Sequence, residues 1–231
     1  MRTSTLPLAV ALLVLGGGAP LTYRFAVVKS TVIITHATAQ RRATVGDIGH
    51  PGDEVRTGWF GRALIETPAQ AARFEILPAT RVQLGGPEPG VLLLVERGRL
   101  KAFFDALSGT DERIVATPGA LLGVRGTRYA VEVQADGAAT LAVFEGAVEV
   151  RPTNPAFPTT RVGAGEVCRY GPRETPQRHP LPPGLTEERW RGGIDVRAGE
   201  GSPRSLHAAS GSGPKSPTAS PPRGKRGGGG G

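Results

Sequence analysis

Residues 129–150 read YAVEVQADGAATLAVFEGAVEV, and this stretch decides the fold class. Apolar and polar residues alternate over 129–133, 140–144 and 147–150, which predicts three short β-strands. Ala135-Asp136-Gly137 lies between the first two, where its turn-forming residues favour a chain reversal. The stretch therefore predicts strands joined by short turns.

The same pattern extends toward the N-terminus. Further strands are predicted over 26–28, 31–35, 74–77, 81–84, 91–95 and 99–104, and the breakers in 85–90 predict a loop. Helix is favoured only over 68–72 and 186–191. Since a βαβ fold needs long helical crossovers, we predict an all-β domain of short, mostly antiparallel strands.

A weak internal repeat leaves two architectures open. Residues 92–100 and 141–148 each contain an apolar strand, a glutamate, a glycine (Gly98 or Gly146) and a second strand. A glycine at this point permits a sharp bend or a close approach of strands. Both a sandwich and a solenoid-like stack are consistent with this repeat.

The two ends differ from the middle of the chain. Residues 1–22 have a positive start, a ten-residue apolar run and small residues, which predicts a signal peptide or, alternatively, an uncleaved anchor. We therefore expect an exported protein, periplasmic or extracellular, that contacts the membrane only if this segment is retained. Residues 25–172 are predicted to form the domain. Residues 173–231 are rich in Pro, Gly and Ser, which predicts a disordered tail; in the alternative, Leu185, Trp190 and Ile194 fold back as a clasp.

Charge and reactive residues exclude several functions. Residues 25–172 carry 16 Lys or Arg against 15 Asp or Glu, so the formal charge of +8 belongs mainly to the ends and predicts no nucleic-acid partner. Cys168 is the single cysteine and the four histidines are scattered, so we expect no disulfide, metal site, cofactor or enzymatic activity. Cys168 itself is interpreted as a small residue in a strand or as a reactive thiol.

Four segments in order resemble the FecR domain of bacterial envelope proteins: 52–58 with 61–63, 115–118 with 123–131, 144–150, and 163–166. The residues that carry the resemblance are interpreted as structural: Gly52, Asp53, Thr57, Gly58, Gly61, Thr117, Pro118, Gly126, Thr127, Glu145, Gly146, Gly165 and Glu166. Residues 67–72 depart from the Asp-Gly-Ser turn of many FecR domains. FecR regulators resemble signal relays with a cytoplasmic sigma-factor-binding segment, which we do not find before Phe25.

Three side chains are candidates for contact with a ligand or partner. Arg125 is expected to pair with a carboxylate such as Asp53, or alternatively to bind a ligand. Trp59 is expected in the core, although with Phe60 it is also a candidate aromatic platform.

The predicted function is a non-enzymatic interaction or sensory module that binds another envelope protein. The alternative is a module that binds polysaccharide or peptidoglycan. Five residues in the predicted strands are expected to share one core: Leu92, Leu94, Val131, Val143 and Val148.

Overall fold

The computed structural model describes residues 21–86, 88, 90–106, 112–192, 194–195 and 202–203. These residues form β-strands with a single short 3₁₀ helix, η1 (Pro68–Gln70). Within these ranges, no helix has the length and apolar character needed to cross a bilayer. The all-β prediction is confirmed. Residues 1–20 of the predicted signal segment and the part of the predicted tail after residue 203 lie outside the described residues.

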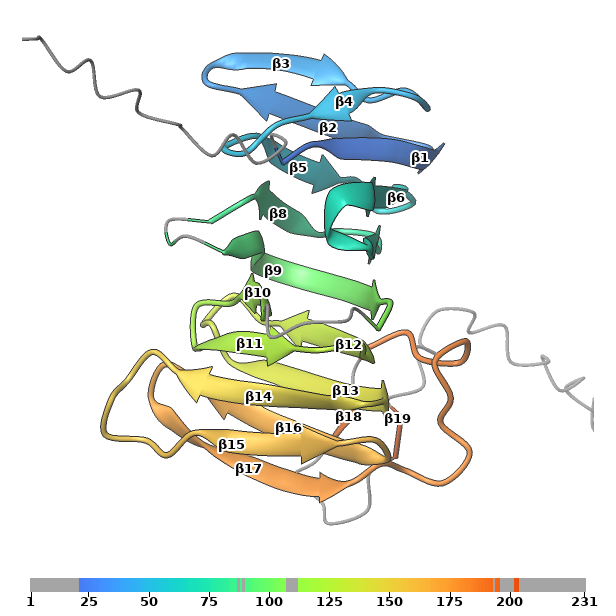
Figure 1. Cartoon of the computed structure of the whole chain (residues 1–231). Coiled ribbons are helices and arrows are strands. Elements are labelled where there is room, and N and C mark those ends of the chain that lie inside the picture. Colours follow the sequence, from blue (N-terminus) through green and yellow to red (C-terminus); the bar gives the residue numbers. More distant parts are fainter. Residues whose placement is uncertain are drawn as a thin grey trace, which may run out of the picture.

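The strands stack nearly in sequence order, from β3 and β4 at one end to β15 and β17 at the other (Figure 1). Hydrogen bonding arranges them in two groups. Sheet A has the order β4, β1, β6, β7, the second half of β9, β12, β13, β16 and β17. Its strands are β1 (Tyr23–Lys29), β4 (Ile48–Gly49), β6 (Arg62–Thr67), β7 (Ala72–Ile76), β9 (Val91–Phe104), β12 (Arg128–Val133), β13 (Ala139–Glu145), β16 (Glu166–Gly171) and β17 (Glu174–Pro180).

Sheet B has the order β3, β2, β5, β8, the first half of β9, β10, β11, β14 and β15. Its other strands are β2 (Val32–His36), β3 (Ala39–Arg42), β5 (Glu54–Thr57), β8 (Arg81–Leu84), β10 (Arg113–Ala116), β11 (Ala120–Val124), β14 (Ala147–Pro152) and β15 (Thr160–Gly163). Neighbouring strands are antiparallel, except that β10 runs parallel to β9. A separate two-stranded pair consists of β18 (Ile194–Asp195) and β19 (Ser202–Pro203).

The long strand β9 joins the two sheets. Its first half pairs with β8 in sheet B, and its second half pairs with β7 and β12 in sheet A. Gly98 lies at the crossing with φ of +98°, a conformation that favours glycine. Gly146, with φ of +76°, marks the corresponding crossing from β13 in sheet A to β14 in sheet B. The bend predicted at these two glycines of the internal repeat is confirmed.

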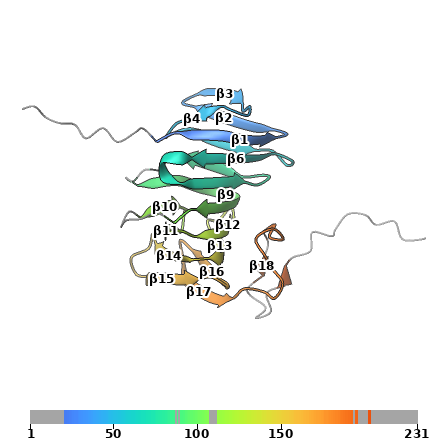
Figure 2. The ribbon, with the colours of Figure 1, turned by 45° about the vertical axis from the view of Figure 1, so that its right-hand side comes forward.

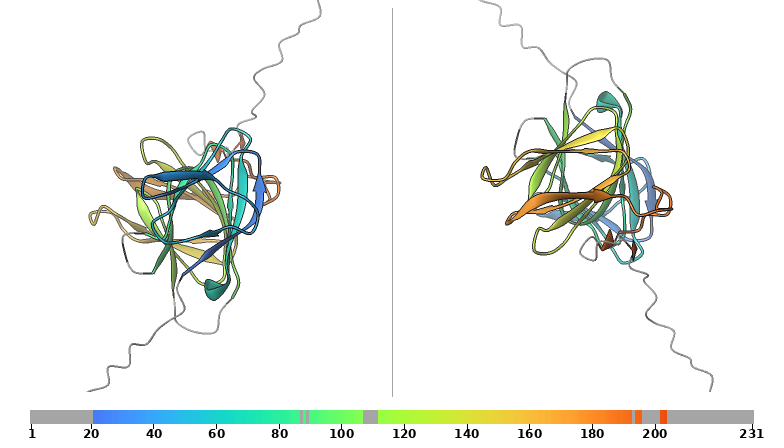
Figure 3. Two further views of the ribbon diagram at one scale, coloured as in Figure 1. Left: turned by 90° about the horizontal axis from the view of Figure 1, so that it is seen from above. Right: turned by 90° about the horizontal axis from the view of Figure 1, so that it is seen from below.

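One continuous apolar core fills the space between the two sheets, which are seen along the stack in Figure 3. Four of the five predicted core residues are buried in it: Leu92, Val131, Val143 and Val148. The prediction for Leu94 is wrong, because Leu94 is only half-buried while Leu93 and Val95 are fully buried. Side chains of a strand alternate between faces, so Leu94 lies on the face opposite to Leu93 and Val95, whereas Leu92 is also buried near the start of the strand.

Buried threonines hold the points where the chain changes sheet. The Thr57 hydroxyl donates to the Leu77 carbonyl (2.7 Å), and the Thr127 hydroxyl donates to the Ala147 carbonyl (2.9 Å). The Thr117 hydroxyl donates to the Ala120 carbonyl (2.9 Å) in the turn between β10 and β11, which both belong to sheet B. At a crossing the backbone leaves its strand partners, so a buried hydroxyl supplies the missing hydrogen bond.

The folded part extends beyond the predicted boundary at Pro172. Strand β17 pairs with β16. The next residues, 181–192, are here called the strap, and they cover part of the outer face of sheet A. Figure 2 shows the chain after β17 lying beside this sheet. Trp190 is buried against Leu77, Ala130, Ala142 and Val167. The alternative of a folded clasp is therefore correct for Trp190, whose indole offsets the cost of ordering this segment. The segment predicted as helix over 186–191 makes only a single turn, with the Trp190 amide donating to the Thr186 carbonyl (2.9 Å).

Candidate functional site

The loop between β5 and β6, residues 58–61, presents two aromatic side chains to solvent. Trp59 is 84% exposed and Phe60 is 85% exposed, so the prediction that Trp59 packs in the core is wrong. The amide of Gly58 donates to the Thr31 carbonyl (2.9 Å), and the Gly61 amide donates to the Gly58 carbonyl (3.0 Å). The loop is tightly anchored, and the two residues between its glycines are turned outward.

Glycine is needed at position 61 for space rather than for backbone freedom. A Cβ atom on Gly61 would lie 2.1 Å from the Thr31 carbonyl oxygen. Neither Gly58 nor Gly61 has a positive φ, in contrast to Gly52, which has φ of +94°. The close backbone approach, and not a left-handed turn, explains this part of the signature.

A groove of about 760 Å³ begins beside Trp59 and runs along the edge of the stack where the chain crosses between sheets. Its lining includes four arginines, Arg56, Arg81, Arg97 and Arg99, and we call it the arginine groove. Glu54 lies 3.7 Å from Arg56 and 3.5 Å from Arg81.

The remaining arginines of this groove differ in their contacts. Arg99 donates to the Arg191 carbonyl of the strap. Arg97 is exposed and has no ion pair among the described residues. An exposed indole near the exposed Arg97 guanidinium suits aromatic, carboxylate or hydroxyl-rich partners.

Arg125 lies in a different place from the aromatic loop. It is exposed in a polar groove of about 620 Å³ that also includes Gly126, Gly146 and Arg161. The predicted ion pair between Arg125 and Asp53 is wrong. Among the described residues, Arg125 has no ion pair.

Asp53 is buried in the first signature segment, and its carboxylate contacts two nearby partners. Its Oδ1 atom lies 2.5 Å from His36 Nδ1, and its Oδ2 atom accepts a hydrogen bond from the His50 amide (3.0 Å). Local partners satisfy this carboxylate, since it closes the turn in which it lies. Gly52 and Asp53 therefore lie in a turn, as their residue types favour.

The other signature residues lie at turns and crossings. A Cβ atom on Gly146 would lie 2.4 Å from the Gly126 carbonyl oxygen, and one on Gly126 would lie 3.1 Å from the Ala106 Cα. Pro118 follows the buried Thr117 in the turn between β10 and β11. These contacts support the structural interpretation of the signature.

The closing segment and Glu145 are held by polar contacts. The Glu166 carboxylate accepts from the Gly163 amide (2.7 Å), and Gly165 has φ of +80° in the turn between them. Glu145 pairs with Arg128 at the surface (3.1 Å). Both carboxylates therefore act in turns or surface pairs of the fold.

Reactive groups do not gather anywhere in the described part of the chain. There, no group of three or more His, Cys, Asp or Glu could hold a metal ion. Cys168 is fully buried in β16, and desolvation raises the pKa of its thiol to about 12. A thiol with this pKa stays protonated near neutral pH and is a poor nucleophile, which supports its interpretation as a small strand residue.

Sequence reasoning found the aromatic loop but missed the arginine groove. The four arginines come from β5, β8 and β9, and the fold brings them together at one edge. No spacing along the chain signals this arrangement, because it depends on the order of strands in the stack. The groove on the outer face of sheet A near Leu64 was not predicted from the sequence either, for the same reason.

The fold and these surfaces define a class of protein, an all-β stack of two sheets. Glycine and threonine residues fix the turns and crossings of its chain, and the candidate contact residues Trp59, Phe60 and Arg125 are exposed. Residues 53–149 match the family model described as FecR protein. The resemblance found in the sequence is therefore confirmed over residues 53–149.

Comparison with solved structures gives two crystal structures of a candidate anti-sigma factor from Parabacteroides distasonis ATCC 8503. Their TM-scores are 0.45 and 0.44, with sequence identities of 18% and 20%. Each match covers 55% of this chain and 59% of the other, so the chain spans less than two thirds of the length of that protein. Comparison with curated proteins gave no match.

Proposed function

We propose that the protein is an exported, non-enzymatic FecR-domain module that binds another envelope protein through the aromatic loop and the adjoining arginine groove. The observation that carries this proposal is the exposure of Trp59 and Phe60 on a firmly anchored loop. Tryptophan and arginine dominate the energetic centres of protein interfaces. The apolar run in residues 1–22 supports export.

The rigidity of the loop strengthens the proposal. In the free protein, two aromatic rings are exposed to water. A partner that covered them would bury their apolar area, and this burial would stabilise the complex. Because Gly58 and Gly61 fix the backbone, little conformational entropy is lost when a partner docks.

The test is affinity capture from envelope extract with the full chain as bait, followed by a binding measurement with each purified captured protein. We expect one envelope protein to bind the wild type, and Trp59→Ala to weaken binding about tenfold or more. Val45→Ala is the matched control, since Val45 is 65% exposed in the connection between β3 and β4. Equal binding by the wild type and Trp59→Ala would contradict the proposal.

A second candidate function is binding of polysaccharide or peptidoglycan. The observation that favours it is the position of the exposed Trp59 indole at the mouth of an open groove, an arrangement on which a sugar ring can stack. Sedimentation with purified cell wall tests it. Co-sedimentation that is lost on Trp59→Ala, together with no captured protein, would favour this function over the first.

A further inference from the structure

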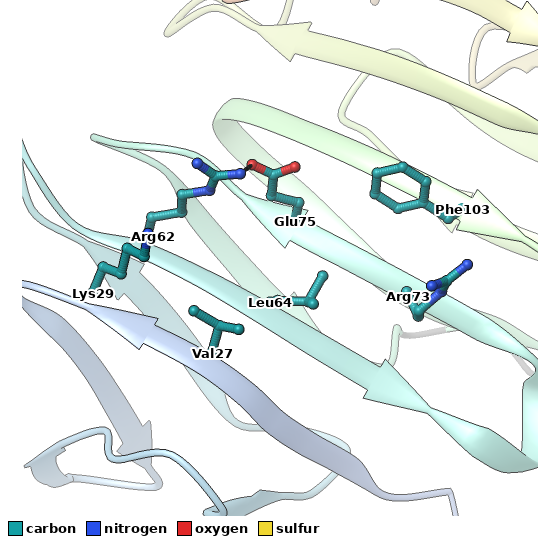
Figure 4. A pocket seen from close by; sticks show the side chains of 7 residues that line it. All are labelled: Val27, Lys29, Arg62, Leu64, Arg73, Glu75 and Phe103. Atoms are coloured by element: carbon teal, nitrogen blue, oxygen red, sulfur yellow. Dashed lines mark ion pairs between the residues drawn. The ribbon is translucent and has the colours of Figure 1, made fainter. Parts of the chain in front are cut away.

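The outer face of sheet A continues past the strap as an open groove. This groove, of about 390 Å³, is shown in Figure 4 and is here called the upper groove. Its apolar floor consists of Val27 on β1, Leu64 on β6 and Phe103 on β9. All three are half-buried, so a partner could remove further apolar area from water.

Charged side chains flank this floor. Arg62 forms an ion pair with Glu75 at one end, and Arg73 lies at the other, with its guanidinium 5.8 Å from the centre of the Phe103 ring (Figure 4). Lys29 is exposed and has no ion pair among the described residues. The groove is therefore lined by three cations and one carboxylate. Arg62 neutralises that carboxylate, and Arg73 Nη2 lies 3.7 Å from the exposed Asp105 carboxylate beside the groove.

The strap shows how the rest of this face is covered. Trp190 packs on Ala130, Ala142 and Val167 of the outer face, and the Lys101 ammonium donates to the Glu187 carbonyl (2.7 Å). The strap is therefore attached to the sheet in two ways: an apolar side chain packs on small residues of the sheet, and a lysine of the sheet donates a hydrogen bond to the strap backbone. Lys101 pairs across the sheet with Glu75, so the covered area and the upper groove adjoin.

We propose that the upper groove binds an extended segment of a partner protein in which acidic residues alternate with apolar ones. Apolar side chains would lie on Val27, Leu64 and Phe103, as Trp190 does in the covered area. The acidic side chains would meet Lys29, Arg62 and Arg73, because opposite charges at an interface rim set its specificity. This site is separate from the aromatic loop and does not depend on it.

Residues 1–20 and 204–231 of the chain itself do not have this chemistry. Residues 204–231 contain five Lys or Arg and no Asp or Glu, and residues 1–20 contain one arginine and no acidic residue. Like charges would repel a basic segment from the upper groove. A partner segment with negative charge is the occupant that the charges favour.

The test uses the full chain and three labelled peptides of equal length, followed by fluorescence anisotropy. One peptide alternates valine with glutamate, the second valine with lysine, and the third serine with glutamate. We expect the valine–glutamate peptide to bind at least about tenfold more tightly than either other peptide, and binding to weaken as salt rises. Equal binding of the three peptides, or preference for either control peptide, would overturn the proposal.

Variants locate the site on the protein. Lys29→Glu combined with Arg73→Glu should reduce binding of the valine–glutamate peptide about tenfold or more, since both side chains are exposed and reversal leaves the core intact. Arg97→Glu combined with Arg125→Glu, two exposed sites outside the upper groove, is the control matched in charge, and Trp59→Ala is the loop control. Both should leave binding unchanged. Loss of binding in either control would overturn the assignment to the upper groove.

Occupancy by the chain itself is measured separately. A photo-crosslinking amino acid at position 64 of the full chain, irradiated without peptide, should give no crosslink to residues 1–20, to residues 204–231 or to a second copy. With the valine–glutamate peptide present, it should crosslink to the peptide. A crosslink to an end of the chain or to a second copy would identify a different occupant and overturn the proposal.

Discussion

At the scale of single residues, the signature of the FecR domain is a set of spatial requirements at corners. Gly126 and Gly146 face one another across a crossing, and the hydroxyl of Thr127 closes it. Trp59 and Phe60, which we propose to bind a partner, are exposed between two fixed glycines, Gly58 and Gly61.

Gly146→Ala should destabilise the domain strongly. The new Cβ would lie 2.4 Å from the Gly126 carbonyl oxygen, at a φ of +76° that already disfavours alanine. Gly165→Ala is the control, because φ there is +80° but no atom lies within 4 Å of the added Cβ. We expect a loss of about 1 kcal/mol for Gly165→Ala and about 3 kcal/mol for Gly146→Ala in urea unfolding. Equal losses would show that the close contact has no effect.

Cys168 makes stability depend on pH in the alkaline range. The thiol pKa is 9.0 when exposed and is raised by burial to about 12. Above pH 9.0 the unfolded chain releases this proton while the folded chain keeps it, so stability falls as pH rises. Between pH 8 and 10, wild type should lose about 1 kcal/mol more than Cys168→Ala in urea unfolding. Parallel pH profiles would contradict the burial of this thiol.

At the scale of elements, the end of the domain is set by β17 and the strap. The sequence from residue 173 is rich in breakers, yet β17 continues sheet A. Pro176 and Pro180 are compatible with this position, because an edge strand leaves part of its backbone unpaired. Trp190 then covers apolar residues of the outer face that would otherwise meet water.

A chain that ends after Pro172 should therefore be less stable than the full protein. It loses β17 and exposes Ala142 and Val167, which Trp190 covers. We expect the thermal midpoint to fall by about 5 °C or more, because burial of a tryptophan contributes about 3 kcal/mol. A chain that ends after residue 203 is the control and should keep the midpoint of the full protein, as the predicted tail implies. Equal midpoints for all three chains would mean that the strap does not stabilise the domain.

At the scale of the whole molecule, two sheets stack around one core and leave separate open grooves at the surface. The aromatic loop and arginine groove lie at the edge where the chain crosses between sheets, and the upper groove lies on the outer face of sheet A. Because neighbours in the stack are close in sequence, most contacts join segments a few strands apart. Such a scaffold can present two surfaces without a change in its core.

Export is a prediction about the whole protein. A fusion of residues 1–45 to a reporter that is active only outside the cytoplasm should be active, since residues 6–15 supply the apolar run of a signal peptide. A fusion of residues 23–45 is the control and should be inactive. Activity confined to a cytoplasmic reporter would contradict export, and N-terminal sequencing would distinguish cleavage from anchoring.

Much of the fold was predictable because alternation is a local property. The strands over 129–133, 140–144 and 147–150 all lie within observed strands, and the bends at Gly98 and Gly146 occur where the repeat placed them. Strands such as β3 and β17 were missed, because their residues are polar or contain proline. Exposed edge strands need no apolar face, so alternation does not reveal them.

The sequence by itself determined the all-β class, the FecR signature and the neutral middle of the chain. Only the tertiary structure decided that Trp59 faces solvent, that Asp53 pairs with His36, and that Trp190 closes the outer face of sheet A. The physical reason is the distance along the sequence over which each effect acts. Strand propensity and turn chemistry act between residues a few positions apart, whereas burial and charge pairing depend on which strands become neighbours in the stack.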